Sequence, residues 1–306
     1  MPVTSTPHVS PERPQVLAAS DLSEGSNAAL VWAAAWATAT GAGLHLVHCV
    51  PRPVFPYWSG AFEDEVVDEW VRHAATRLGE QYQGCCPGSP EAESVHVAFG
   101  EPAAEVSAHA AKLGASALVL GPHRPRVVFD DILGTTADRI LRTAPIPCVA
   151  ANRPFPELLR QVLFPVDFSR PSHHAVDVGM ALLAPLLKAA TADAPLVIEF
   201  LFVSAYASPS KKNFQVEPAL QQVIERATAH VPAGAAVRLL PRILSAPLPV
   251  EGIHKAADRM EADLIIMGTH GYSSLGRALI GSVASAVTRT VPFAVVLVPP
   301  PDPHTP

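Results

Sequence analysis

The sequence predicts two α/β domains in tandem, each with a five-stranded parallel sheet that helices cover on both faces. The length of 306 residues is about twice that of a typical domain. Hydrophobic residues make up 49% of the chain and charged residues 16%, which provides enough apolar side chain for packed cores. Short apolar segments alternate with helical patterns, and the whole series occurs twice.

The repeat is the strongest of these observations. Segment 15–23 resembles 161–169, and 117–123 resembles 264–270, so the copies are separated by 146 to 147 residues. The shorter motifs at 134–135 and 143–145 recur at 281–282 and 290–292. Such a constant spacing over a whole unit indicates a duplicated domain rather than a short solenoid repeat. It places the domains at 12–151 and 158–300, with the join around 152–156.

Continuous runs of Val, Ile and Leu predict strands that are covered on both faces, as in parallel sheets. The runs lie near 15–20, 44–50, 94–99, 117–121 and 146–150, and near 161–166, 196–203, 236–244, 263–267 and 293–298. Between them, segment 61–83 carries an apolar stripe, and its acidic residues cluster near its start, which suits a helix dipole. Alternating strands and helices predict right-handed crossovers in a parallel sheet.

Composition excludes several classes of protein. The net charge of −6 argues against a nucleic-acid-binding protein, which needs Lys and Arg to neutralise phosphates. The uncharged stretch 28–50 is long enough to span a bilayer, but its Ala, Thr and Gly are weakly apolar. A break at Gly41-Ala42-Gly43 favours a helix and then a buried strand, so we expect no membrane segment.

Cysteine usage indicates the cellular compartment. Adjacent Cys85 and Cys86 have poor geometry for an ordinary disulfide, and the chain has no C-x-x-C pair. The N-terminal segment lacks the apolar core of a secretion signal. We therefore expect a reducing, cytoplasmic environment.

Candidate ligand-binding residues follow the ends of the predicted strands, where open parallel sheets bind ligands. Asp21 and Asp167 follow the first strand of each copy, and the loop from Gly268 to Ser282 has the pattern G-x2-G-x9-G-S. Glycine permits positive φ and close approach to an anion, and a helix beginning at Ser282 offers unpaired N–H groups. Glycines also serve as ordinary turn and cap residues, but this full spacing between a strand and a helix favours a phosphate site.

On these residues the chain resembles the universal stress proteins of the UspA superfamily over nearly all of 12–300. Segments 162–169 and 268–284 and the turn Gly100-Glu101-Pro102 carry the resemblance. It implies an adenine nucleotide alpha hydrolase-like fold, doubly wound, with strand order 3-2-1-4-5. It also implies that ATP binds, with Mg²⁺, and that the two domains pair through their fifth strands within one chain. A further homodimer stays open.

The resemblance also assigns roles to residues. In the second copy it implies nucleotide contacts at Pro165, Val166, Asp167, Val203, Met267, Gly268, His270, Gly271, Gly281, Ser282, Val283 and Ala284. Val203 would pack near the adenine, Met267 and Gly268 would line the base and ribose, and the later residues would hold phosphates through backbone N–H groups. His270 has an equal alternative as an ordinary polar loop residue. The corresponding candidates in the first copy are Asp21, Gly121, Gly134 and Thr135.

The first copy departs from the pattern because Arg124 stands where the second copy has Gly271. The Arg124 side chain would block the approach to phosphate, or its guanidinium would reach a phosphate oxygen. We favour weakened or lost binding in the first copy, and therefore about one ATP per chain.

The sequence favours a nucleotide-binding regulator of a stress response over an enzyme. No Walker lysine follows Gly281, so we name no catalytic residue and expect slow ATP hydrolysis at most. Asp167 could organise Mg²⁺. The alternatives are an ATP-independent scaffold or dimerisation protein, and an ATP-consuming enzyme of the same broad fold such as an adenylating ligase.

Overall fold

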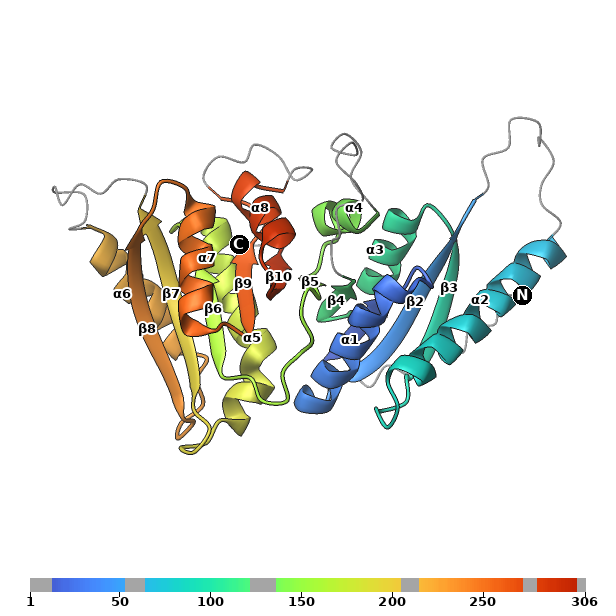
Figure 1. Ribbon diagram of the computed structural model, residues 1–306, viewed down its shortest axis with the longest axis horizontal. Helices are drawn as coiled ribbons and strands as arrows, with labels where there is room; N and C mark the ends of the chain where they lie inside the picture. The colour runs from blue at the N-terminus through green and yellow to red at the C-terminus, as the bar shows by residue number, and fades with distance from the viewer. Residues whose placement is uncertain (1–12, 53–63, 122–135, 205–214, 272–279, 302–306) are drawn as a thin grey trace. The chain divides into compact units, whose positions relative to one another are not determined.

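The computed structural model describes residues 13–52, 64–121, 136–204, 215–271 and 280–301. The chain divides into two compact units, Met1–Pro154 and Phe155–Pro306, called unit 1 and unit 2 below. Each unit repeats the strand–helix alternation that the sequence predicts (Figure 1).

Unit 1 contains the first five strands. Its elements are β1 (Gln15–Ala19), η1 (Glu24–Ser26), α1 (Asn27–Thr40), β2 (Gly43–Pro51), α2 (Asp64–Cys85), β3 (Ser94–Gly100), α3 (Pro102–Leu113), β4 (Ala117–Leu120), α4 (Thr136–Thr143) and β5 (Cys148–Ala150). The strands pair in the order β3-β2-β1-β4-β5. All four pairings are parallel, as the continuous apolar runs predict.

Unit 2 repeats this order. Its elements are β6 (Gln161–Pro165), α5 (Arg170–Ala189), β7 (Leu196–Ser204), α6 (Val216–Thr228), β8 (Val237–Ser245), α7 (Pro249–Met260), β9 (Leu264–Gly268), α8 (Ser282–Thr290) and β10 (Ala294–Val298). The strands pair in the order β8-β7-β6-β9-β10, again in parallel. The predicted strand order 3-2-1-4-5 is therefore confirmed.

Helices cover both faces of each sheet, which makes the units doubly wound. In unit 2, Phe164 and Phe200 pack under α5, where Gly179 lies against the Phe164 ring. On the opposite face Gly252 of α7 lies against Val203. In unit 1, Trp70 of α2 contacts Phe99, and His109 of α3 stacks on His96. These two residues of β3 are an odd number apart and so point to opposite faces.

The uncharged stretch at 28–50 forms a helix and a strand, as expected. Helix α1 ends at Gly41, which has a φ of 70° and so takes the left-handed conformation that commonly ends helices. Trp32 and Trp36 are buried in the core and stack with their ring centroids 5.2 Å apart. None of the helices in the described ranges combines the length and apolar content needed to cross a bilayer.

One strand boundary differs from the sequence expectation. The fifth strand of the first copy begins at Cys148 rather than 146, because Pro145 and Pro147 have no N–H to donate to a neighbouring strand. The four cysteines are free thiols, and Cys86 is buried. Its Sγ lies 3.5 Å from that of Cys85, and burial raises the pKa of the Cys86 thiol to about 12. A thiol with such a pKa is a poor nucleophile.

Candidate functional site

The candidate residues of the second copy gather around one pocket of unit 2, with a volume of about 300 Å³. The pocket lies at the carboxyl ends of β6, β7 and β9, next to the first turns of α7 and α8. All twelve candidates line it: Pro165, Val166, Asp167, Val203, Met267, Gly268, His270, Gly271, Gly281, Ser282, Val283 and Ala284. The loop between Gly271 and residue 280 falls outside the described residues.

The pocket also contains residues that the sequence analysis missed, namely Ser172, Leu201, Phe202, Pro249, Ile253 and Thr269. Two of these residues could have been found by aligning the two copies of the repeat. Pro249 and Ile253 lie 147 residues after Pro102 and Val106, in the helix that follows the third strand of each copy. The others needed the fold, because nothing in the sequence shows how far a strand end reaches into a crevice.

Val166, Leu201, Phe202, Val203 and Ile253 give the pocket an apolar wall. Val203 is held in place because α7 carries Gly252 beside it, where a Cβ would come within 2.6 Å of a Val203 methyl group. The Phe202 ring stacks on Phe168, with 4.9 Å between centroids. Such a wall suits a flat, weakly polar group such as a nucleobase.

Asp167 is held by a closed set of hydrogen bonds at the start of α5. Its Oδ1 accepts from the Ser169 N–H at 3.0 Å and from the Ser169 hydroxyl at 2.6 Å. Ser169 caps the helix by accepting from the Ser172 N–H, and the Ser172 hydroxyl accepts from the Asp167 N–H. The preceding turn requires Phe168 at a φ of 65°, a conformation that non-glycine residues rarely adopt. The carboxylate is thereby fixed at the edge of the pocket.

The same loop occurs in unit 1. Asp21 accepts from the Ser23 N–H at 2.9 Å and from its hydroxyl at 2.5 Å, and Leu22 has a φ of 62°. Partial burial acts to raise the pKa of Asp21, but the hydrogen bonds from Ser23 outweigh it, and the pKa lies below its ordinary value. The aspartate that follows the first strand, Asp21 in unit 1 and Asp167 in unit 2, therefore has the same structural role in both units.

The glycines of the pocket serve close packing rather than positive φ, which corrects the expectation from sequence. A Cβ at Gly271 would collide with Oδ2 of Asp167, and one at Gly268 would come within 3.4 Å of the Pro171 carbonyl. Gly281 has a φ of −56°, and a Cβ there would lie 3.2 Å from the Thr269 carbonyl oxygen. Left-handed glycines occur in the described residues at Gly41, Gly88, Gly114 and Gly234 instead.

The first turn of α8 supplies the polar end of the pocket. The Gly281 N–H already donates to the Thr269 carbonyl at 2.7 Å, so this residue is not itself a donor toward a ligand. Gly281 is the N-cap residue of α8, and as a glycine it has no side chain that could accept from the N–H groups of the first turn. The N–H groups of Ser282, Val283 and Ala284 belong to the first turn, where no helical carbonyl lies four residues earlier. They form a cradle suited to an anion.

His270 is oriented by its neighbour in the same loop. The Thr269 hydroxyl contacts the Val298 carbonyl at 3.2 Å and His270 Nδ1 at 2.8 Å. Because the carbonyl can only accept, the hydroxyl donates to it and accepts from Nδ1–H. The Nδ1 atom of the ring therefore carries a proton.

Unit 1 places different side chains at the equivalent points. Ser20 stands 146 residues before Val166, and strand pairing aligns His48 with Phe202. The Ser20 hydroxyl is 2.6 Å from Gln81 Oε1, and His48 Nδ1 is 2.8 Å from the Ser20 carbonyl. Gly121 packs against the Gly25 carbonyl, where a Cβ would lie 3.2 Å away. Gly134, Thr135, His123 and Arg124 lie outside the described residues. The apolar wall of unit 2 has polar counterparts here.

Comparisons with known proteins agree with the repeat and the fold. A sequence model of the universal stress protein family matches residues 12–152 and again 159–299. A Thermus aquaticus protein, described as the universal stress protein in the QAH/OAS sulfhydrylase 3′ region, is 36% identical over 85 residues. That match spans 27% of this chain and 62% of the relative's length.

Solved structures resemble the chain over almost its whole length. A universal stress protein from Archaeoglobus fulgidus DSM 4304 has a TM-score of 0.63 at 17% identity, over 94% of this chain and 98% of its own. A putative universal stress protein from Pseudomonas aeruginosa UCBPP-PA14 has a TM-score of 0.56 at 16% identity, over 94% and 93%. These likenesses support the fold. The chain belongs to the universal stress protein family and carries two of its domains in tandem.

Proposed function

We propose that unit 2 binds an adenine nucleotide, ATP with Mg²⁺, and that the chain is a nucleotide-binding regulator of a stress response. The observation that carries this proposal is the pocket itself. It joins an apolar wall to the first turn of α8, so one ligand with a flat base and a charged phosphate end fits both parts.

The residues present fit such a ligand. The wall around Phe202 and Val203 would take the base, and the N–H groups of Ser282, Val283 and Ala284 would hold phosphate oxygens. The Ser282 hydroxyl adds a donor. Mg²⁺ prefers phosphate oxygens and one or two carboxylates, and Asp167 is the carboxylate at the pocket edge. The described lining residues include no Lys or Arg, so backbone dipoles and Mg²⁺ would balance the phosphate charge.

The differences between the pocket of unit 2 and the equivalent positions of unit 1 support one nucleotide per chain. Unit 1 replaces two wall residues with Ser20 and His48 and ties both into its own hydrogen bonds. In its sequence Arg124 stands in place of the second glycine of the loop. Slow hydrolysis is the most that we expect of unit 2, because no lysine follows Gly281. Among the described lining residues, Asp167 and His270 are the titratable side chains.

Isothermal titration of ATP with Mg²⁺ into the full chain tests the proposal. We expect a stoichiometry near one, and a loss of affinity of at least about 100-fold in Gly281→Val, because the added side chain displaces the start of α8 from the Thr269 carbonyl. Gly134→Val, at the equivalent point of the first copy, is the matched control and should bind ATP normally.

Ser282→Ala provides a milder variant in case Gly281→Val perturbs folding. Loss of one hydroxyl hydrogen bond to a charged group should weaken binding by about tenfold. Equal binding of two ATP per chain would refute the one-site proposal. No heat from wild type at millimolar ATP would refute nucleotide binding and favour the scaffold alternative.

A further inference from the structure

Unit 1 holds a cluster of three histidines on the face of its sheet that α3 covers. His45 of β2 is buried, with an exposed fraction of 1%, and His96 of β3 and His109 of α3 are half-buried. The His96 and His109 rings stack in parallel, with 3.8 Å between centroids and 4° between planes. The Nε2 atom of His109 is buried and has no hydrogen-bond partner among the described residues.

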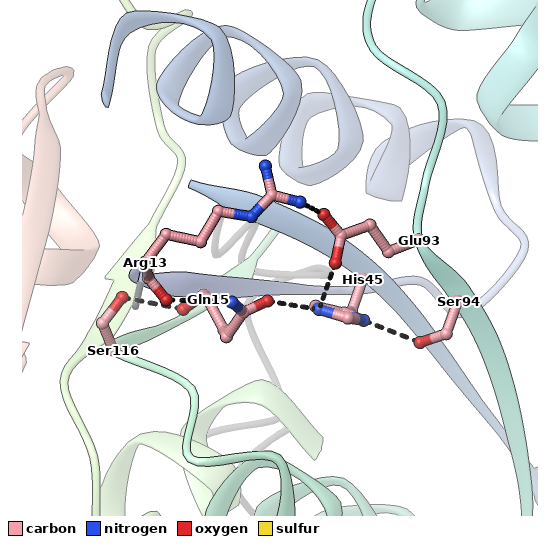
Figure 2. A network of polar contacts seen from close by, with 6 residues as sticks. All are labelled: Arg13, Gln15, His45, Glu93, Ser94 and Ser116. Atoms are coloured by element: carbon pink, nitrogen blue, oxygen red, sulfur yellow. Dashed lines mark hydrogen bonds and ion pairs between the residues drawn. The ribbon is translucent and has the colours of Figure 1, made fainter. Parts of the chain in front are cut away.

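His45 is fully satisfied as a neutral ring (Figure 2). Gln15 donates its Nε2 to the Arg13 carbonyl, so its Oε1 faces His45 Nε2 at 2.7 Å and accepts the ring proton. Nδ1 then accepts from the Ser94 hydroxyl at 2.7 Å. Glu93, which pairs with Arg13, lies 3.8 Å from Nε2. The Gln15 carbonyl in turn accepts from the Ser116 hydroxyl. This network ties β1, β2 and β3 together around an uncharged imidazole.

The stacked rings of His96 and His109 lack a comparable set of hydrogen-bond partners, since His109 Nε2 has none among the described residues. A proton on His109 Nε2 would sit buried without an acceptor, and a charged buried donor without a partner is costly. A second proton on His96 would place two cations in face-to-face contact. Lys112 on α3 opposes both protonations, whereas Glu105 favours that of His96 to a smaller extent. The Cys49 thiol on the same face stays neutral because burial raises its pKa to about 11.

We propose that the His96–His109 pair makes unit 1 acid-sensitive, so that its protonation releases α3 from the sheet at a pH at which unit 2 stays folded. This regulatory device is independent of nucleotide binding. Unit 2 has no histidine at these points: Glu199 aligns with His45, Arg242 with His96, and Ala256 with His109. In unit 2 the two carboxylate oxygens of Glu199 accept from the Arg259 guanidinium at 2.6 and 2.7 Å. An ion pair therefore takes the place of the histidine cluster on this face of the sheet.

The direction of the pH effect follows from the pKa values of the ring nitrogens. Burial, then the neighbouring His96, His45 and Lys112, lower the pKa of His109 to about 4, and burial lowers the pKa of His96 and His45. Histidines of the unfolded chain have a pKa near 6.5, so the unfolded state binds more protons below that value. Unit 1 is therefore most stable above about pH 6.5, and this stability is lost progressively as the pH falls toward about 4.

Hydrogen exchange of the full chain between pH 7.5 and 4.5, without nucleotide and corrected for intrinsic exchange rates, tests the proposal. Protection of α3 and β3 should fall by about tenfold per pH unit for each extra proton taken up, while α7 and β8 keep theirs. Tryptophan fluorescence gives a second readout of unit 1, because all four tryptophans, at positions 32, 36, 58 and 70, belong to it.

His109→Phe keeps a ring on His96 but cannot take a proton, so its acid transition should move to lower pH by about one unit or more. His73→Gln removes an exposed histidine of α2 and is the matched control, with an unchanged transition expected. If His109→Phe does not fold, imidazole NMR of wild type decides. His109 should stay neutral down to the pH at which α3 loses protection. Parallel loss of protection in α3 and α7, or a variant with the wild-type transition, would overturn the proposal.

Discussion

His45 and Glu199 occupy the same point of the second strand in the two units, opposite Leu17 and Leu163. In unit 1 the residue is a neutral imidazole between Gln15 and Ser94. In unit 2 it is a carboxylate with an exposed fraction of 3%, held by Arg259, with Arg242 Nε 3.4 Å away. Both solutions satisfy a buried polar group, but only the second relies on charge. A duplicated fold therefore keeps its backbone plan while its halves diverge in how they respond to protons.

The two cores differ in a similar way next to α1 and α5. Unit 1 has Ala18 on its first strand and Ala33 on the helix above, whereas unit 2 has Phe164 and Gly179 at the same positions. A Cβ at Gly179 would come within 2.6 Å of the Phe164 ring. The large ring of unit 2 is thus accommodated by a missing methyl group on the helix, and the two units fill this part of the core with different side chains.

The largest expected effect comes from breaking this pair. Phe164→Ala should destabilise unit 2 by about 3–5 kcal/mol, because the ring is buried and leaves a cavity. Gly179→Ala alone should cost about 1–3 kcal/mol through overpacking. In the Phe164→Ala background the same change should cost less, because the contact with the ring is gone and only the Ile266 methyl group, at 2.8 Å, still opposes the added Cβ. Hydrogen exchange of unit 2 in increasing denaturant measures all three variants. Additive effects would disprove the coupling.

The second largest effect tests how much the ion pair of Glu199 contributes to the stability of unit 2. Arg259→Met removes the guanidinium that donates to both oxygens of Glu199. We expect a loss of about 2 kcal/mol, below the range for a fully buried pair, because the Arg259 side chain is 48% exposed and Arg242 remains. Exchange in β7 reports the change. The double variant Glu199→Met, Arg259→Met should recover most of the loss, since no buried charge is left unpaired and the Arg242 side chain is 42% exposed. A double variant as unstable as the single one would contradict this account.

The smallest effect concerns the ends of α3 and α7. Gly114 ends α3 with a φ of 64°, and the equivalent residue of α7, Glu261, has a φ of 52°. Because only glycine takes this conformation without cost, Glu261→Gly should stabilise unit 2 by about 1 kcal/mol and Gly114→Ala should destabilise unit 1 by a similar amount. Denaturant-dependent exchange of the two helices compares them directly. Changes of the same sign in both units would contradict the prediction.

The sequence by itself determined much of this protein. Strand positions and the repeat followed from apolar runs and a constant spacing, because parallel strands buried on both faces leave a strong pattern. The strand order came from the resemblance to the universal stress proteins. Twelve candidates from the second copy meet in one pocket, since the carboxyl ends of neighbouring parallel strands lie at one sheet edge.

Only the tertiary structure decided how these residues are used. Gly271 and Gly281 are small because Asp167 and the Thr269 carbonyl lie against them, a constraint between segments about 100 residues apart in the first case and a dozen in the second. Leu201 and Phe202 enter the pocket through the length of β7, which no local pattern encodes. The histidine pair of unit 1 is likewise legible only in three dimensions, because β3 and α3 bring together two rings that are 13 residues apart in the sequence. Burial and contact set the properties of these side chains, and both depend on the assembled fold.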